Sequence, residues 1–182
     1  MVLVDEDAVL VLPEPLATQA IAVWEKWKDA CTVWGQQHNN IDPAQVAAMI
    51  WRESAGNPRA FRREPNGWTG VGLLQITHPH LKGGKTDEEL MVPAVNLEIG
   101  CRYIAALTRK YGDFPRVSAA FNAGSPRGRA GDPWNLYCTG DHVDAEVRAL
   151  NTIVLYDRKV QTDKAVAMQF DVQELATVGV HE

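Results

Sequence analysis

One carboxylate in this chain, Glu53, lies where a proton donor would be useful. Val46, Met49 and Ile50 recur at helical spacing, and the next position on that apolar face is Glu53. Burial disfavours the charged form of a carboxylate, so the pKa of Glu53 should lie above its ordinary value. A carboxylic acid that keeps its proton near neutral pH can donate it to a leaving group. The segment therefore offers general acid chemistry.

A second interpretation of the same segment is structural. Charged residues in apolar stripes are usually paired, and Arg52 or Arg59 could hold Glu53 as an ion pair at the edge of the core. On this segment alone the ion pair is the better interpretation. The helix that carries Glu53 is well delimited, because Asp42 and Pro43 suit its first turn and Gly56 with Pro58 ends it.

The composition excludes several classes of function. The chain has 182 residues, a net charge of −5 and no basic block, so nucleic acid is not expected as a partner. No apolar run approaches the roughly 20 residues that span a bilayer, so membrane insertion is not expected. Met1–Val4 is followed at once by Asp5–Asp7, which is unlike a secretory signal peptide.

No metal or cofactor is predicted. Cys31, Cys101 and Cys138 are widely spaced and are expected to be small buried hydrophobic residues, although one disulfide remains open. His78 and His80 flank a proline, the other histidines are scattered, and no cluster of Cys, His and carboxylates has the spacing of metal ligands.

The elements that must position Glu53 are mostly helices. Helical periodicity predicts a mainly α domain with one small irregular or β element at Val71–Ile76, either a short strand or a tight turn passing under a cleft. Three tryptophans of the first helix share one side and are expected to pack in the core rather than to stack on sugars. The helices are expected at Leu16–Gln37, Pro43–Glu53, from Pro93 to Gly112, Pro115–Ala123 and Asp144–Met168. Residues 1–15 form an N-terminal extension, 16–168 the domain, and 169–182 a C-terminal tail without helical pattern.

Four separated segments carry one shared pattern. In chain order they are Glu53–Pro58, Gly72–Ile76, the run from Asn96 to Gly112 that closes on Tyr111, and Ala119–Gly124, with a weaker fifth at Glu146–Arg148. Together they resemble the Slt-type lytic transglycosylases, the goose-lysozyme-like group of peptidoglycan-cleaving enzymes. The match extends over roughly residues 40–156, and four segments in this order are far more specific than any one of them. A lysozyme-like α+β fold is the expectation.

The resemblance also implies roles for residues. Glu53 matches the catalytic acid of the family, which now favours the proton donor over the ion pair. Gln75 matches a glutamine on the cleft floor, and Asn122 an asparagine near the catalytic group. Ser54 and several glycines match positions that suit an architectural role. The candidate substrate-binding residues are Gln75, Asn122, Phe121, Ser54 and Tyr111.

Three features depart from the family pattern. Phe121 stands where the family usually has Tyr, and the missing hydroxyl would leave Glu53 in a drier site. Thr77 stands where many relatives have Met. The stretch from Asn57 to Gly70 is longer than usual, and its arginines either line the cleft or, as the safer interpretation, belong to a solvated loop.

The reaction that the resemblance implies needs one acid. Glycosidases with two carboxylates place a second Asp or Glu opposite the acid. Glu64 lies in the arginine-rich stretch and Asp87–Glu89 at the expected start of a helix, so no carboxylate has an obvious claim to the second role. Glu53 alone is then expected to cleave between N-acetylmuramic acid and N-acetylglucosamine, with a 1,6-anhydromuramic product.

Two alternatives stay open. One is a hydrolytic goose-type lysozyme, and the other is a virion structural component with weak or lost activity. The substrate, the glycan strands of peptidoglycan, lies outside the membrane. With no signal peptide, a protein made in the host cytoplasm by a bacteriophage is expected, either released at lysis or carried in a virion with tail or baseplate proteins as partners.

Overall fold

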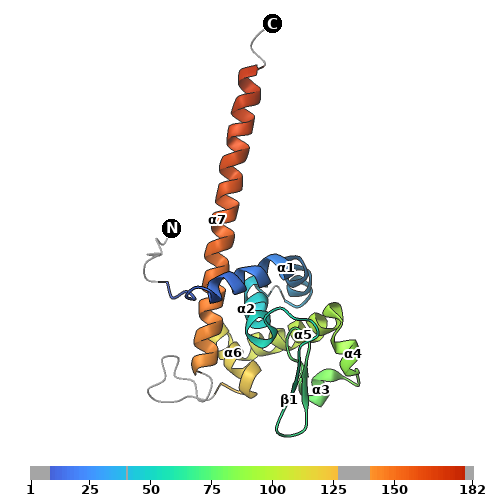
Figure 1. Cartoon of the computed structure of the whole chain (residues 1–182). Coiled ribbons are helices and arrows are strands. Elements are labelled where there is room, and N and C mark those ends of the chain that lie inside the picture. Colours follow the sequence, from blue (N-terminus) through green and yellow to red (C-terminus); the bar gives the residue numbers. More distant parts are fainter. Residues whose placement is uncertain (1–8, 40, 127–139, 179–182) are drawn as a thin grey trace.

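The computed structural model describes residues 9–39, 41–126 and 140–178. Its helices and strands confirm a mainly helical fold with a small antiparallel sheet (Figure 1). In chain order the elements are α1 (Leu16–Gln37), α2 (Pro43–Ser54), β1 (Phe61–Arg63), β2 (Thr69–Val71), α3 (Pro79–Lys82), α4 (Asp87–Leu90), α5 (Pro93–Tyr111), α6 (Phe114–Ala123) and α7 (Gly140–Val178).

The α1 helix packs its tryptophans inward, as predicted. Trp24 is buried, and its indole N–H donates to Asp157 of α7 at 3.2 Å. Trp27 packs against the core and donates to the carbonyl of Gly56, just past the end of α2, at 3.1 Å. Trp24 and Trp27 therefore pack α1 against α7 and the end of α2, and they do not form a surface on which sugars stack.

The α2 helix has the start and stop that its sequence predicts. Asp42 caps it by accepting from the amide of Ala44 at 2.9 Å, and Pro43 occupies the first turn. Its middle, Val46–Trp51, is wholly buried. The helix ends at Ala55 in the left-handed conformation, with φ of 49°. Glu53 therefore leaves the last turn of a helix that is embedded in the core.

The small sheet is a hairpin followed by a tight turn. Strand β1 pairs antiparallel with β2, and Val71 makes a further bridge to Ile76. Gly72 opens the turn at φ of 79°, where a side chain would collide with Asn96 and the carbonyl of Leu90. The predicted strand or turn at Val71–Ile76 is thus mainly a turn.

Asn96 of α5 anchors that turn. Its side chain is fully buried, accepts from the amide of Leu74 at 2.8 Å, and donates to the carbonyls of Val71 and Leu90, both at 2.9 Å. Because a buried amide with three partners is satisfied, it holds the turn rigidly against α5.

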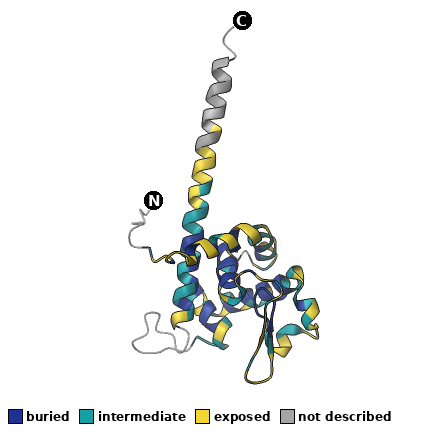
Figure 2. Cartoon of the chain, in the orientation of Figure 1, coloured by how far each residue is buried: buried dark blue, intermediate teal, exposed yellow. Residues whose placement is uncertain are grey.

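The α7 helix is longer than predicted. Its buried residues recur on one face, and Figure 2 shows this buried face giving way to an exposed surface where the helix leaves the rest of the domain. The expectation that the helix ends at Met168 and is followed by an extended tail is wrong, since the helix continues to Val178. No helix among the described residues has the length and apolarity to cross a membrane.

The buried cysteines behave as predicted. Cys31 on α1 and Cys101 on α5 are both fully buried and free, and burial raises the pKa of each thiol. Cys138 lies outside the described residues.

Candidate active site

Glu53 lies where its sequence predicts, inside the domain. Its side chain is 8% exposed. Loss of water is the main cause that raises the pKa of the carboxyl to about 7, and the nearby carboxylate of Glu146 is the second. His142, Arg62 and Arg52 also lie near the carboxyl, and their electrostatic effect lowers its pKa. Its place at the carboxyl end of α2 also disfavours the anion, because the helix dipole is negative there. Glu53 is therefore an acid poised near neutral pH.

Two side chains of α7 lie against Glu53. His142 Nε2 is 3.8 Å from Glu53 Oε1 and 3.0 Å from Glu146 Oε1. The three side chains offer ligand atoms that all lie within 4.8 Å of one another. Two expectations from the sequence need correction here. A cluster of His and carboxylates with ligand spacing does exist, and Glu146 is a second carboxylate close to the acid.

Both corrections have one cause, which is that separate helices meet. His142 and Glu146 are one turn apart on α7, so they share a face. Glu146 is fully buried and lies in the stripe Val143, Glu146, Ala149 and Ile153, whose members are all buried. The same signal that singled out Glu53, a carboxylate in an apolar stripe, could therefore have identified Glu146 as well.

A cleft of about 730 Å³ opens beside the hairpin. Its walls come from the hairpin, the turn after it, α3, α5 and α6. Glu53 is not among the lining residues. Arg62 connects the cleft with Glu53, because it lines the cleft and its charge also acts on the Glu53 carboxyl. Of the three arginines in the long stretch, Arg62 alone lines the cleft, and the stretch forms the β-hairpin rather than a loop.

Gln75 lines the cleft at a strained backbone position. Its φ is 44°, in the left-handed region that few non-glycine residues adopt. The side-chain amide nitrogen donates to the carbonyls of Ala60 and Gly72, at 3.2 and 3.0 Å. These bonds use both amide hydrogens, so the carbonyl oxygen is the atom left to accept a bond from a ligand.

Two more of the candidate residues lie in the cleft. Phe121 and Asn122, at the end of α6, both line it, and the ring of Phe121 packs on Tyr103 with centroids 5.5 Å apart. The other two do not line it. Ser54 donates its hydroxyl to the carbonyl of Ile50 at 3.1 Å, which is an architectural role.

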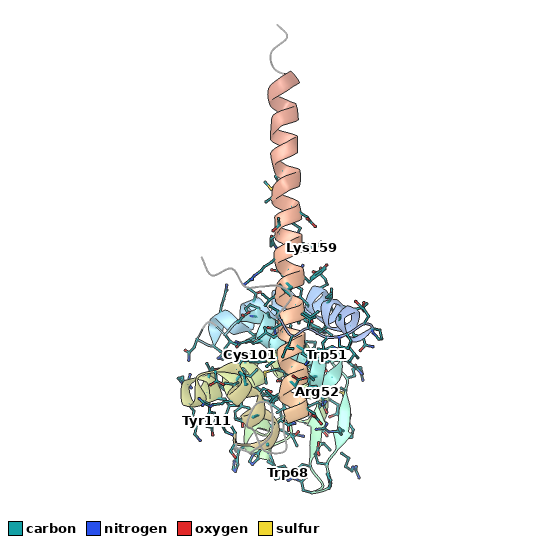
Figure 3. The ribbon with its side chains drawn as sticks, turned by 90° about the vertical axis from the view of Figure 1, so that its left-hand side faces the viewer. Trp51, Arg52, Trp68, Cys101, Tyr111 and Lys159 are labelled. Atoms are coloured by element: carbon teal, nitrogen blue, oxygen red, sulfur yellow. The ribbon has the colours of Figure 1, made fainter. Side chains whose placement is uncertain are left out.

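Tyr111 does not reach the cleft either. It ends α5 beneath the ammonium of Lys110, which lies 4.9 Å from the ring centroid. Figure 3 shows Tyr111 well away from Trp68 at the hairpin. Neither Ser54 nor Tyr111 lines the described cleft, so substrate binding by these two residues stays a prediction from the sequence.

Trp68 was not expected at the site. It lies on the hairpin, lines the cleft, is 39% exposed, and contacts His78 edge to face with centroids 4.8 Å apart. An exposed tryptophan on a cleft wall presents a flat apolar face of the kind on which sugar rings stack. No periodic pattern singles out Trp68 in the sequence, because it comes directly after the turn at Asn66 and Gly67.

Comparison with known proteins identifies the family. Residues 31–131 match the family model described as the Transglycosylase SLT domain, and this range contains Glu53, Gln75 and Asn122. The chain belongs to the transglycosylase SLT domain family. The resemblance seen in the four segments is thereby confirmed at the level of the family.

Individual relatives agree with this SLT assignment. "Invasion protein IagB" of Salmonella typhimurium is 28% identical over 104 residues, which cover 54% of this chain and 64% of that protein. "X polypeptide" of Escherichia coli is 30% identical over 89 residues, covering 46% of this chain and 53% of that protein. "Lysozyme g" of Cyprinus carpio is 39% identical over 82 residues, or 42% of each chain. The matches thus span from 42% to 64% of the length of these relatives.

Proposed function

We propose that this protein is a peptidoglycan lytic transglycosylase with Glu53 as its single general acid and base. The observation that carries the proposal is a covered carboxyl with a pKa of about 7, in the segment that matches the SLT family. Its substrate is the β-1,4 bond between N-acetylmuramic acid and N-acetylglucosamine.

The reaction starts with proton transfer. Glu53 protonates the glycosidic oxygen, the bond from that oxygen to the anomeric carbon breaks, and the substrate's own N-acetyl group stabilises the positive charge on that carbon. The Glu53 carboxylate then takes the proton from the muramic C6 hydroxyl, whose oxygen bonds to the anomeric carbon. The 1,6-anhydro ring closes, Glu53 regains its proton, and no water is consumed. A covered acid favours this ring closure, because water is excluded from the reacting atoms.

The cleft supplies the binding surface in this proposal. Trp68 stacks on a sugar ring, the carbonyl oxygen of Gln75 accepts a bond from a sugar hydroxyl or amide, and Asn122 offers both a donor and an acceptor. Arg62 stands at the same wall, where its guanidinium can meet a carboxylate of the peptide stem.

A zymogram with peptidoglycan tests whether the protein is an enzyme of this kind. Wild type should clear the gel. Glu53→Gln keeps the shape of the side chain but has no transferable acid proton, so its clearing rate should be lower by about a hundredfold or more. Equal clearing by both proteins would remove Glu53 from the mechanism. If neither protein cleared the gel, the remaining alternative, a structural component with lost activity, would be favoured.

A hydrolytic lysozyme is the second candidate, and one observation favours it. Glu146 brings a second carboxylate within 4.8 Å of Glu53, and two-carboxylate sites are typical of hydrolytic glycosidases. Glu146 is, however, fully buried, which leaves it no access to a sugar or to an attacking water. We therefore assign Glu146 an electrostatic effect on Glu53 and keep ring closure as the proposed reaction.

The place of action is a further part of the proposal. A bacteriophage origin, with release at lysis or delivery by a virion through tail or baseplate proteins, remains a prediction from the sequence. Mass spectrometry of purified virions would support the virion form if it detected the chain there, and detection in lysates alone would support release at lysis.

A further inference from the structure

The cluster of Glu53, His142 and Glu146 combines three potential metal ligands from two helices. Glu53 comes from the last turn of α2, while His142 and Glu146 are one turn apart near the start of α7. The imidazole Nε2 lies between the two carboxylates, 3.0 Å from one oxygen and 3.8 Å from the other. This donor set is more than the single acid that the proposed reaction needs.

The cluster also holds buried polar atoms without partners. Among the described residues, three buried atoms make no aligned hydrogen bond: the two carboxylate oxygens of Glu146 and the Nε2 of His142. The Nε2 of His142 nevertheless lies 3.0 Å from Glu146 Oε1. The contact is short, but its angles do not suit hydrogen bonding. A fully buried carboxylate without an aligned hydrogen bond is costly, so a bound cation would stabilise Glu146.

We propose that Glu53, His142 and Glu146 bind a zinc ion, and that the bound ion inhibits the enzyme. Imidazole nitrogens and carboxylate oxygens are both zinc ligands, and three protein ligands leave a fourth position for water. Magnesium and calcium prefer six or more oxygen ligands, which these three side chains do not supply.

The spacing of the three side chains suits a small tetrahedral ion. Zinc binds nitrogen and oxygen at about 2.0–2.1 Å, which places neighbouring ligands of a tetrahedral site about 3.3 Å apart. The distances here are 3.0 Å, 3.8 Å and at most 4.8 Å, so a small side-chain rotation of Glu53 closes the site.

Inhibition follows from the identity of one ligand. A Glu53 carboxylate that coordinates zinc carries no proton to give to the glycosidic oxygen, and its lone pair is engaged. The inhibitory part of the inference rests on the proposed function. The binding part does not, because the three side chains can hold zinc whether or not the protein cleaves peptidoglycan.

The test measures zinc binding directly on the full chain after treatment with a chelator. Competition with a chromophoric zinc chelator should give one site, and zinc chloride should raise the Tm while magnesium chloride does not. His142→Asn and Glu146→Gln should each weaken binding roughly tenfold or more. Far-UV circular dichroism and the Tm without zinc confirm that each variant is folded. A double variant of the exposed pair, His78→Asn with His80→Asn, is the matched control and should bind zinc like wild type.

The outcomes separate the two proposals. Loss of binding in the cluster variants but not in the control supports the zinc site, whether or not the zinc-free protein clears peptidoglycan. No binding to the folded wild type overturns the site, and so does undiminished binding in both cluster variants. In either of those cases, clearing by the zinc-free protein would still support the proposed function. Clearing that zinc leaves unchanged while the site is occupied would overturn the inhibition.

Discussion

At the scale of single residues, the chemistry depends on how one carboxyl keeps its proton. Glu53 does so mainly because it is desolvated, and secondly because Glu146 lies close to it. Two helices create this environment, and neither helix contains it alone. The sequence identifies Glu53 as the acid from the apolar stripe on α2. The size of its pKa shift could not be predicted, because that shift also depends on Glu146, which lies 93 positions later in the chain.

The pH dependence of activity follows from this arrangement. Only protonated Glu53 can donate, so the rate should fall as pH rises through about 7. Glu146→Gln removes a charge that raises the pKa of Glu53, so the alkaline limb of the pH–rate profile should move to lower pH. Rates of peptidoglycan clearing measured between pH 5 and 9, at intervals of about half a pH unit, give the position of this limb. Glu98→Gln, on the exposed side of α5, is the control. A limb that stays in place or moves upward in Glu146→Gln would contradict the electrostatic role.

Trp68 gives a second prediction at this scale. Trp68→Ala should raise KM for glycan strands roughly tenfold with a smaller change in kcat, because stacking holds the sugar but does not touch the proton. Since the side chain is 39% exposed, the Tm should change little. Initial rates on soluble glycan fragments of increasing concentration would show it. A large loss of kcat with unchanged KM would argue that Trp68 positions the reacting bond instead.

At the scale of elements, the turn after the hairpin places Gln75 in the cleft, and Asn96 holds that turn. Asn96→Ala removes three hydrogen bonds and leaves an amide and two carbonyls unsatisfied in the core. The variant should lose about 3 kcal/mol of unfolding free energy. Urea titration followed by circular dichroism measures the loss, with Asn66→Ala in the exposed hairpin as the control. A loss below about 0.5 kcal/mol would show that Asn96 is not the anchor.

The predicted helices are largely confirmed because their local signals agree with their packing. The bounds of α1 match the prediction, and those of α2, α5 and α6 differ by one residue, since caps, prolines and apolar stripes all mark the same positions. The hairpin was missed because its outer strand, Phe61–Arg63, is exposed on both faces and so has no alternation of apolar and polar residues. The end of α7 was predicted too early for a related reason. Residues 161–165 are exposed, and an exposed part of a helix carries no apolar stripe by which it could be recognised.

At the scale of the whole molecule, the long α7 helix has two parts. Its first half carries His142 and Glu146 and packs on α2 and α6, while residues 161–165 are exposed and the helix runs on beyond the domain (Figure 1). Deletion of residues 169–182 should therefore leave the Tm within about 2 °C of wild type and the clearing rate within about twofold. Thermal unfolding and clearing assays measure both. A larger fall in either would mean that the last residues belong to the folded domain.

Ring closure and hydrolysis differ in which oxygen bonds to the anomeric carbon. The most direct measurement digests peptidoglycan with wild type in water enriched in heavy oxygen, followed by mass spectrometry of the released muropeptides. Ring closure through the C6 hydroxyl takes no oxygen from the solvent, so the account predicts 1,6-anhydro ends without the heavy label. Reducing ends that carry one heavy oxygen would contradict it and show that water, rather than the sugar itself, attacks once Glu53 has given up its proton.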